Sequence, residues 1–457
     1  MAARKRHSVV REPVHGDVYL THEELALLDT PEMQRLRGIK QLGTAHLVYP
    51  GAVHTRFEHS IGTVHVAQRL IDAINRANAL DPAVTLGIGE EEARVIRLAA
   101  LLHDVTHVPY GHNIEDQDGL FERHDSAHRY RRMFDRSRAL GRTLDDIGAK
   151  EDVYSVLVPE GAVDRRATPP YWSQVISGTI AADILDYLAR DAYFTGLRLQ
   201  VDPRVTSYFK VERTGGNLYI DLSKHELLRE DILSEIVRML EARYYFSERV
   251  YYHHAKVSAG ALLAKAVDLA VREGELAEDD LYDQTDASIL TLLERAVATA
   301  PQGVRALVHD LLERFAGRRL YKRACVFPRY ENEAAQDGLV ERFFALGGGP
   351  ARTESEERMA DLVRFATGRD VRLIVYCPAR RMQLKEARIH VRWPGEAEIR
   401  PLSTFADRIP RLADLERSYR DLWKFYVFAD TPDRALLEKV REVATVEFRE
   451  ATNAYRG

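Results

Sequence analysis

The apolar residues near the amino terminus predict a short extended segment followed by helices. Residues 8–20 are typical of extended structure with a turn at 15–17. Thr21, with Glu24 three residues later, indicates a capping box, and Thr30-Pro31 indicates a second helix start. A helical repeat then predicts one buried face, made of Met33, Leu36, Ile39 and Leu42.

Two longer helices are predicted next, and the second is buried. Residues 56–74 repeat their apolar positions at helical spacing. Acidic residues at 90–92 start another helix, where the helix dipole favours them, and its tail at 96–102 is almost entirely apolar. This helix therefore carries His103 and Asp104 into the interior. Pro109 and Gly111 then prevent regular helix before His112.

The rest of the chain divides into a helical part and a mixed part. Helices are expected at 121–140, 171–194, 225–271, 303–320, 411–426 and 432–449, and strands within 208–222, 320–327, 371–377 and 389–393. The fold class that we predict is mainly α. It has a helical domain over residues 1–320, with its core at about 50–195 and a pocket helix at about 225–271, and a smaller α+β region over residues 321–457.

The composition is that of an ordinary globular protein. The 457 residues are 45% hydrophobic and 30% charged, with a formal net charge of −5. This balance gives no global positive field and does not indicate a nucleic-acid partner. Only Cys325 and Cys377 are present, so neither a disulfide framework nor a cysteine zinc site is expected. No signal-peptide pattern or membrane-spanning apolar run occurs, and we expect a cytoplasmic protein with no membrane association.

Histidine and aspartate gather within residues 55–112 at a spacing that suits a metal ion. His103 and Asp104 end the buried helix, and His107 and His112 follow within nine residues. With His59 and the distant Asp183 they form a mixed set that suits Mn, Fe, Zn, Co or Mg without selecting among them. A His-Asp pair is more often structural, and a buried histidine is more often a satisfied core residue. Burying so much polarity without a ligand would be expensive, however, and this favours a metal site.

The same stretch carries a resemblance to a known family. The motifs that carry it are Pro13-Val-His-Gly16, Asp29-Thr-Pro-Glu-Met-Gln-Arg-Leu-Arg37, Ile39-Lys-Gln-Leu-Gly43, Tyr49-Pro-Gly-Ala52, His54-Thr-Arg-Phe-Glu-His-Ser-Ile-Gly62, Leu102-His-Asp-Val-Thr-His-Val-Pro-Tyr-Gly-His112 and Asp186-Tyr-Leu-Ala-Arg-Asp191. Over about residues 8–260 the chain resembles the HD-domain phosphohydrolases. Within them it is similar to the dNTP triphosphohydrolase branch, which includes dGTPases and the dNTPase that joins a SAM domain to an HD domain.

The resemblance implies roles for the site residues. One divalent metal ion would be bound by His59, His103, Asp104 and Asp183. The phosphates would be contacted by Arg56, His107 and His124, with His112 as general acid oriented by Glu115. Sugar and base would be contacted by Gln41, Leu42, Tyr187 and Asp191. The implied reaction is attack of a metal-activated hydroxide on the α-phosphate of a dNTP, which releases a deoxynucleoside and tripolyphosphate.

The sequence departs from this family in two places. Ile184 follows the last metal aspartate, where the human-type enzyme has a lysine. The pocket residues within 243–256 do not align uniquely, and the candidates are Arg243, Arg249, Tyr252, His253 and Lys256.

Regulation and oligomeric state are further expectations from the resemblance. Asp29, Gln34 and Arg37 fall where the family has a nucleotide-sensing site at a subunit contact. We therefore expect a homo-oligomer, a dimer or a tetramer, and leave open whether a nucleotide activates it.

Two alternatives to a dNTP triphosphohydrolase stay open. The metal centre could serve a nucleoside monophosphate, a cyclic nucleotide or another phosphoester, a reading that Ile184 favours. The chain could also be a nucleotide-binding regulator without catalysis, against which the complete His/Asp set argues. The role of residues 330–457 is open between subunit contacts and a structural cap.

Overall fold

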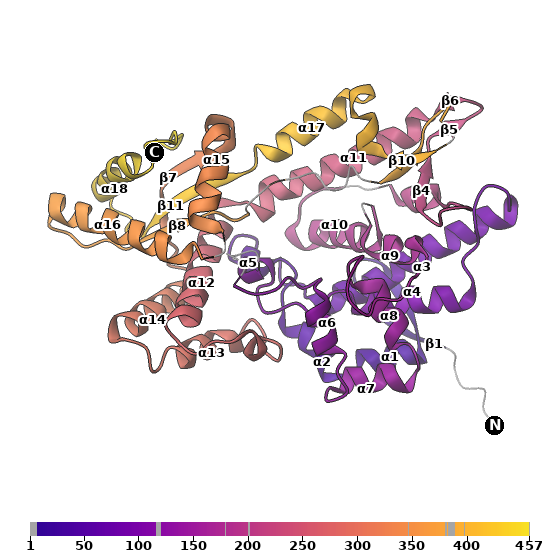
Figure 1. Ribbon diagram of the computed structural model, residues 1–457, viewed down its shortest axis with the longest axis horizontal. Coiled ribbons are helices and arrows are strands. Elements are labelled where there is room, and N and C mark those ends of the chain that lie inside the picture. The colour runs from indigo at the N-terminus through magenta and orange to yellow at the C-terminus, as the bar shows by residue number, and fades with distance from the viewer. Residues whose placement is uncertain are drawn as a thin grey trace.

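Two assemblies of helices flank the middle of the molecule in the computed structural model (Figure 1). The structure describes residues 7–115, 120–178, 180–199, 202–345, 347–379, 382, 389–396 and 398–456. The amino-terminal helices lie on one side, and a three-stranded sheet with its covering helices lies on the other. The prediction of a mainly α protein with smaller sheets is confirmed.

The amino-terminal hairpin and its two helices follow the sequence closely. β1 (His7–Glu12) pairs antiparallel with β2 (Gly16–Thr21), and the Thr21–Glu24 capping box starts α1 (His22–Leu28). α2 (Pro31–Arg35) is shorter than the apolar repeat suggested, because the chain continues as the 3₁₀ turns η1 (Leu36–Gly38) and η2 (Gly43–Leu47). All four residues of the predicted apolar face are nonetheless buried.

Three helices position the candidate site. α3 (Arg56–Leu80) packs against both α4 (Glu90–Leu102) and α10 (Ala182–Thr195). The expected helix at 171–194 is in fact two helices, α9 (Pro170–Ser177) and α10, because Gly178 leaves the helical conformation with φ −70° and ψ −176°. This break puts Asp183 in the first turn of α10 rather than in the middle of a longer helix.

Short helices cover this core. They are α5 (His112–Glu115), α6 (Ala127–Met133), α7 (Ala139–Asp146) and α8 (Lys150–Leu157). The helix expected at 121–140 was wrong over its first residues: α6 begins only after Ser126, whose hydroxyl accepts from the backbone N–H of Arg129 as an N-cap.

The segment expected to be one long helix at 225–271 contains several elements. After η3 (Pro203–Tyr208), β3 (Phe209–Val211) and β4 (Leu218–Asp221), a small hairpin forms from β5 (Ser223–Lys224) and β6 (Leu227–Leu228). α11 (Glu230–Phe246) then passes through a π-helical turn, η4 (Ser247–Tyr251), into α12 (His254–Arg272). His253, with an extended backbone (φ −60°, ψ 128°), follows this turn and caps α12, so α12 does not continue the register of α11.

The carboxyl-terminal half begins with η5 (Glu278–Leu281), α13 (Ser288–Ala296) and α14 (Gln302–Ala316). Its antiparallel sheet has the order β7-β11-β8, formed by β7 (Lys322–Pro328), β11 (Lys424–Ala429) and β8 (Leu373–Tyr376). The covering helices are α15 (Arg329–Phe344), α16 (Gly349–Thr367) and α18 (Arg434–Glu447). The helix expected at 411–426 ends early as α17 (Pro410–Arg420), because the buried residues from Lys424 onward pair as the central strand of this sheet.

A second sheet joins the two halves of the chain. β9 (His390–Arg392) and β10 (Ile399–Pro401), followed by η7 (Leu402–Arg408), complete the order β10-β9-β4-β3. β9 runs parallel to β4, a strand from the expected helical domain. The boundary at 320/321 remains a prediction, and hydrogen bonds cross it. Within the described residues, the helices are all too short or too polar to cross a membrane.

Candidate metal centre and phosphate pocket

Three helices bring the four predicted metal ligands together. His59 comes from the first turns of α3, His103 and Asp104 follow the last turn of α4, and Asp183 lies in the first turn of α10. His59 Nε2 lies 3.0 Å from Asp183 Oδ1 and 3.2 Å from His103 Nε2. His103 Nε2 lies 3.6 Å from Asp104 Oδ1 and 3.7 Å from Asp183 Oδ1. These side chains therefore converge on one point from three directions.

A second layer of hydrogen bonds fixes the two imidazoles. His59 donates through Nδ1 to Asp186 at 2.7 Å, and His103 donates through Nδ1 to the Ala100 carbonyl at 2.8 Å. Both bonds leave Nε2 pointing into the centre as a lone-pair donor, which is how histidine ligands are normally oriented. Asp186 is itself held by a bidentate pair with Arg190, at 2.9 Å for each bond, and by His15 at 2.6 Å.

Asp186 and His15 were missed as functional residues at the sequence level, although both lie in the quoted motifs. The signal for Asp186 is its place three residues after Asp183, on the same face of α10. His15 gives no such signal, because its contact with Asp186 joins residues far apart in the chain.

The charges of this centre are strongly coupled. Burial opposes the charged imidazole of His59, but the hydrogen bonds to Asp183 and Asp186 outweigh it and raise the pKa of His59 to about 10. Burial likewise opposes ionisation of Asp104, yet the neighbouring Arg56 and His103 hold its pKa well below the usual range. The centre thus favours positive charge between its carboxylates.

The donor set fits a divalent metal ion. His59, His103 and Asp104 offer ligand atoms that all lie within 4.8 Å of one another. Asp183 adds a carboxylate oxygen 3.0 Å from His59 Nε2 and 3.7 Å from His103 Nε2. Histidine nitrogens and carboxylate oxygens are donors that bind such an ion. Two carboxylates beside two imidazole nitrogens favour positive charge at this position, and a divalent cation would supply it in place of an imidazole proton. His59, His103, Asp104 and Asp183 are therefore the residues that would hold it.

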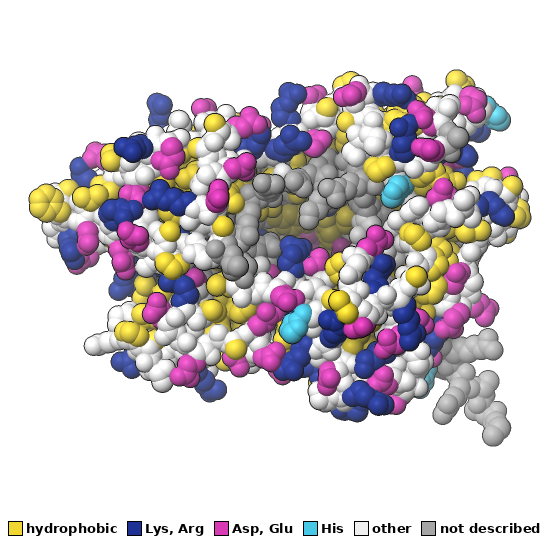
Figure 2. Space-filling view, in the orientation of Figure 1, with side chains coloured by type: hydrophobic (Ala, Val, Ile, Leu, Met, Phe, Trp, Pro, Cys, Tyr) yellow, Lys and Arg dark blue, Asp and Glu magenta, His cyan; other side chains and the backbone are white. Residues whose placement is uncertain are grey.

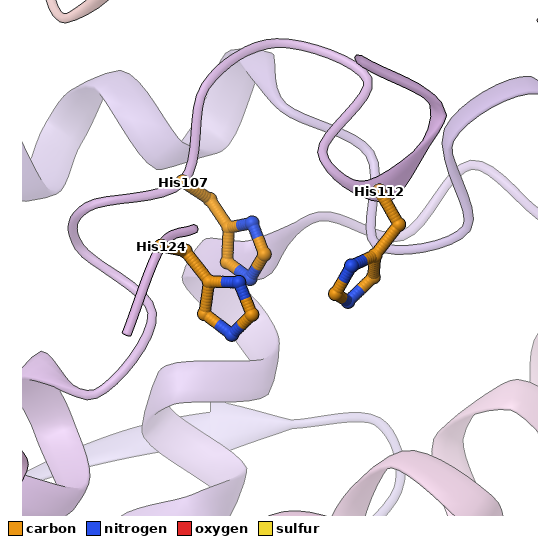
Figure 3. A group of neighbouring side chains, drawn as sticks. All are labelled: His107, His112 and His124. Atoms are coloured by element: carbon orange, nitrogen blue, oxygen red, sulfur yellow. The ribbon is translucent and has the colours of Figure 1, made fainter. Parts of the chain in front are cut away.

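A second group of histidines lies beside the metal centre (Figure 3). The rings of His107 and His124 stack at 3.9 Å between centroids, and His112 faces them with its ring centroid 5.3 Å from that of His107. The nitrogens of the three lie within 4.8 Å of one another. His107 also reaches the metal centre, because its Nε2 lies 3.3 Å from Asp104 Oδ1.

A single buried carboxylate stands behind this group. Glu115 accepts from Nδ1 of His107 at 3.2 Å and from Nδ1 of His124 at 3.0 Å. It also accepts from Arg129 at 2.8 Å, and Arg129 is fully buried. Burial opposes the ionisation of Glu115, but the two histidines hold its pKa well below the usual range. The expected orientation of His112 by Glu115 stays a prediction, whereas the contacts with His107 and His124 are direct.

Arg56 connects the two groups. Its guanidinium donates to Asp104 Oδ2 at 2.5 Å. A Cβ placed on Gly111 would lie 2.8 Å from the Arg56 side chain, so the loop before His112 requires glycine at this point. Gly111 and Tyr110 both have positive φ, 44° and 57°. This backbone turns His112 toward Arg56 and the other histidines.

Both groups open into one cavity of about 980 Å³. In the space-filling view the molecule is hollowed near the middle of this face (Figure 2). Most of the predicted substrate residues line the cavity, namely Gln41, Leu42, Arg56, Tyr187, Asp191 and Tyr252. Arg243, Tyr251 and Lys256 line it as well, and so does Ile184.

Two of the predicted pocket residues lie elsewhere. Arg249 and His253 are absent from the described residues that line the cavity. The Arg249 side chain is exposed and lies over the Tyr245 ring, and His253 caps α12 by accepting from the backbone N–H of Ala255. Tyr251, at the end of the π turn Ser247–Tyr251, lines the cavity, and its hydroxyl donates to Asp191 at 2.7 Å.

Comparison with known proteins locates two family regions in this chain. The family described as HD domain matches residues 56–147, and the family described as HD associated region matches residues 224–453. The first match covers His59, His103, Asp104 and the three-histidine group. The second spans α11, α12 and the expected boundary at 320/321.

Three relatives are 27–29% identical to this chain over the residues that align. "Uncharacterized protein MJ1154" of Methanocaldococcus jannaschii is 29% identical over 71% of this chain and 60% of its own length. "Uncharacterized protein YwfO" of Bacillus subtilis is 28% identical over 71% of this chain and 74% of its own length. The "Deoxynucleoside triphosphate triphosphohydrolase SAMHD1 homolog" of Dictyostelium discoideum is 27% identical over 70% of this chain, which matches 60% of that protein.

Proposed function

This chain belongs to the HD-domain family of metal-dependent phosphohydrolases that carry an HD associated region, and from that premise we propose that it hydrolyses dNTPs to deoxynucleoside and tripolyphosphate. The observation that carries the proposal is the lining of the cavity. It combines Asp104 and Asp183 of the metal centre, Arg56 and the three histidines with Gln41, Leu42, Tyr187 and Asp191. A volume of about 980 Å³ is at the upper end for small-molecule sites and accommodates a nucleoside beside its phosphates.

The metal ion and the residues around it have different roles in the proposed reaction. A divalent ion, when bound, supplies Lewis-acid polarisation of a phosphoryl oxygen and a water with a lowered pKa. Arg56 binds the phosphate oxygens and offsets the charge that develops on them, and His107 and His124 contact the phosphates beside it. Burial and Arg56 lower the pKa of His107 to about 4, so His107 adds no positive charge at neutral pH. His112 faces this group across the opening and holds the proton for the departing ester oxygen.

Sugar recognition is assigned to other residues of the cavity lining. Asp191 is held on one side by His54 Nε2 at 2.9 Å and on the other by the Tyr251 hydroxyl at 2.7 Å. A carboxylate fixed in this way accepts from a sugar hydroxyl without reorienting. The Gln41 amide oxygen is buried, has no hydrogen-bond partner among the described residues, and supplies a second polar contact in the lining.

A specific observation favours the alternative substrate. Ile184 lines the cavity directly after Asp183, so the triphosphate loses the lysine that the resemblance placed there. Arg243 and Lys256 line the same cavity and provide positive charge from α11 and α12 instead. Because these two residues supply the positive charge that the missing lysine would have given, we retain the triphosphate as substrate. A monophosphate or cyclic nucleotide is the second candidate. The intact metal set weighs against a regulator without catalysis.

A product assay tests the proposal. Metal-reconstituted protein is incubated with dNTPs, NTPs, nucleoside monophosphates and cyclic nucleotides in the presence of Mn, Mg, Fe or Co, and products are separated by ion exchange. Tripolyphosphate with deoxynucleoside supports the dNTP reaction. Release of orthophosphate from a monophosphate, or opening of a cyclic nucleotide without any tripolyphosphate, replaces the substrate and keeps the metal centre.

Regulation and assembly belong to the same proposal. Asp29 and Arg37 are exposed, and Arg37 donates to the Gln34 amide oxygen at 2.8 Å. The three residues thus form one surface beside α2, where an activating nucleotide at the contact of a homo-oligomer would bind. Activity that appears only in dNTP mixtures, together with a dNTP-dependent change of mass in solution, is the expected result.

A further inference from the structure

A short segment before α13 lies between the two loops that carry Gln41 and His112. Its central residue, Asp286, is 2% exposed and uses both carboxylate oxygens. Oδ2 accepts from the backbone N–H of Lys40 at 2.9 Å, and Oδ1 accepts from the backbone N–H of Tyr110 at 2.9 Å. One side chain therefore joins two loops that are far apart in the sequence.

The backbone around Asp286 strengthens this connection. Its N–H donates to the Gly38 carbonyl at 2.9 Å. The preceding Thr285 packs so closely on Gly38 that an added Cβ there would lie 2.5 Å from its methyl carbon. The segment is thus seated against the first loop by its backbone and by its side chains.

Arg35 makes a parallel connection from the other side. Its guanidinium donates to the carbonyls of Gln284 at 3.1 Å, Val105 at 2.9 Å and His107 at 2.8 Å. The same three segments therefore meet twice, once at a buried guanidinium and once at a buried carboxylate. Asp286 is the connection that lies nearer to Gln41 and His112 along both loops.

Each partner of Asp286 is close in sequence to a residue of the proposed reaction. Lys40 directly precedes Gln41 and Leu42, and Tyr110 lies two residues before His112. Tyr110 has a φ of 57°, which is unfavourable for a residue other than glycine. The bond from its N–H to Asp286 helps to hold this conformation, and with it the direction in which His112 leaves the loop.

We propose that Asp286 is a positioning residue that sets the distance between the sugar-and-base contacts of Gln41 and Leu42 and the proton donor His112. This inference rests on the proposed function, because it assigns both loops to one substrate. An aspartate is required, since a carboxylate accepts two N–H bonds in opposite directions. An asparagine offers one oxygen and would turn its own N–H₂ toward a donor.

The test compares Asp286→Asn with a matched loss of a buried carboxylate, Asp268→Asn. Asp268 is equally buried on α12 and pairs with Arg272 at 2.7 Å, away from the cavity. Asp286→Asn is expected to lower kcat by about 10²-fold, since displacements of roughly 1 Å have that effect, with the bound metal unchanged. Asp268→Asn is expected to lower the Tm and to leave kcat per folded molecule as in the wild type.

A double-mutant cycle separates positioning from general damage. Gln41→Ala should cost much less activity in the Asp286→Asn background than in the wild type or in Asp268→Asn, because the loop is already displaced. Independent, multiplicative losses would overturn the inference. So would an Asp286→Asn variant with full kcat.

Hydrogen exchange gives a readout that does not depend on the substrate. Asp286→Asn should speed exchange in peptides covering 38–43 and 108–113 together, and Asp268→Asn should not. Unchanged exchange in either peptide would overturn the inference even if the wild type hydrolysed no dNTP. A wild type that is active only on another phosphoester would refute the dNTP proposal, and the same variants would then be measured on that substrate.

Discussion

The metal centre and the neighbouring histidine group contain similar residues but are built in opposite ways. In the metal centre, Asp104 and Asp183 point toward the same position as the two imidazole Nε2 atoms. In the histidine group Glu115 lies behind the rings and is paired with Arg129, while Asp104 of the metal centre lies 3.3 Å from His107 Nε2. The first arrangement attracts a cation. The second places Arg56 at the cavity, where its guanidinium suits an anion, beside His107, whose pKa burial and Arg56 lower to about 4.

The supports of the two groups differ as well. The metal ligands come from α3, α4 and α10, three packed helices, and Asp186 with Arg190 backs them from inside the core. The histidine group comes from a loop, the short α5 and the stretch before α6. These packed helices would hold the ion in a rigid frame, whereas the proposed phosphate contacts depend on loops that other segments must fix in place.

Removal of the metal ligands should produce the largest effect and the clearest contrast. His103→Ala with Asp104→Ala eliminates two of four donors, so bound metal and activity should fall together, the activity by about 10⁴-fold or more. Metal content is measured by elemental analysis and activity by tripolyphosphate release. Full turnover by metal-free protein would refute the metal centre.

Truncation in the histidine group should affect chemistry without affecting the metal. His112→Ala removes the proposed proton donor, and kcat should fall by about 10²–10⁴-fold while the bound metal stays at the wild-type level. Elemental analysis of the same preparation serves as the control. Loss of the metal in this variant would show that the two groups are one site and that the acid assignment is wrong.

The way in which each group is built decides how much of it could be predicted from the sequence. The buried tail of α4 and its His103-Asp104 end carry a local signal, so the helix could be predicted directly, while the assignment of these two residues as metal ligands stays a prediction. Tyr251 and Asp286 could not, because a π-helical turn and a contact between distant loops have no periodic signature. The end of the helix expected at 411–426 was wrong for a similar reason: residues 424–426 belong to a strand, and a uniformly apolar run does not reveal its strand neighbours.

Weakening the support of the metal centre should have an intermediate effect. Asp186→Asn keeps the size of the side chain but removes the charge that orients His59, so metal affinity should fall by about 10–100-fold. Titration with a competing chelator measures this change. Asp268→Asn, which removes another buried carboxylate, should retain wild-type affinity. Equal losses in both variants would mean that Asp186 acts only on stability.

The smallest expected effect is on stability and concerns His65. Its ring stacks on that of His15, which contacts Asp186, with 4.9 Å between the ring centroids. Burial and the positive charges of His15 and Arg69 lower the pKa of His65 to about 4, although Asp186 and Glu12 partly oppose the shift. In the unfolded chain the pKa lies near its ordinary value of about 6.5. The unfolded state therefore binds the proton first as the pH falls, so this contribution to stability is complete above pH 6.5 and is lost toward pH 4. His65→Asn should flatten the pH dependence of the Tm in this window by about 1–2 °C, measured on metal-free protein so that metal release does not contribute. An identical pH dependence of the Tm in both proteins would show that His65 makes no pH-dependent contribution to stability. Only the inner residues of the support, Asp186 and Arg190, would then distinguish the metal centre from the histidine group.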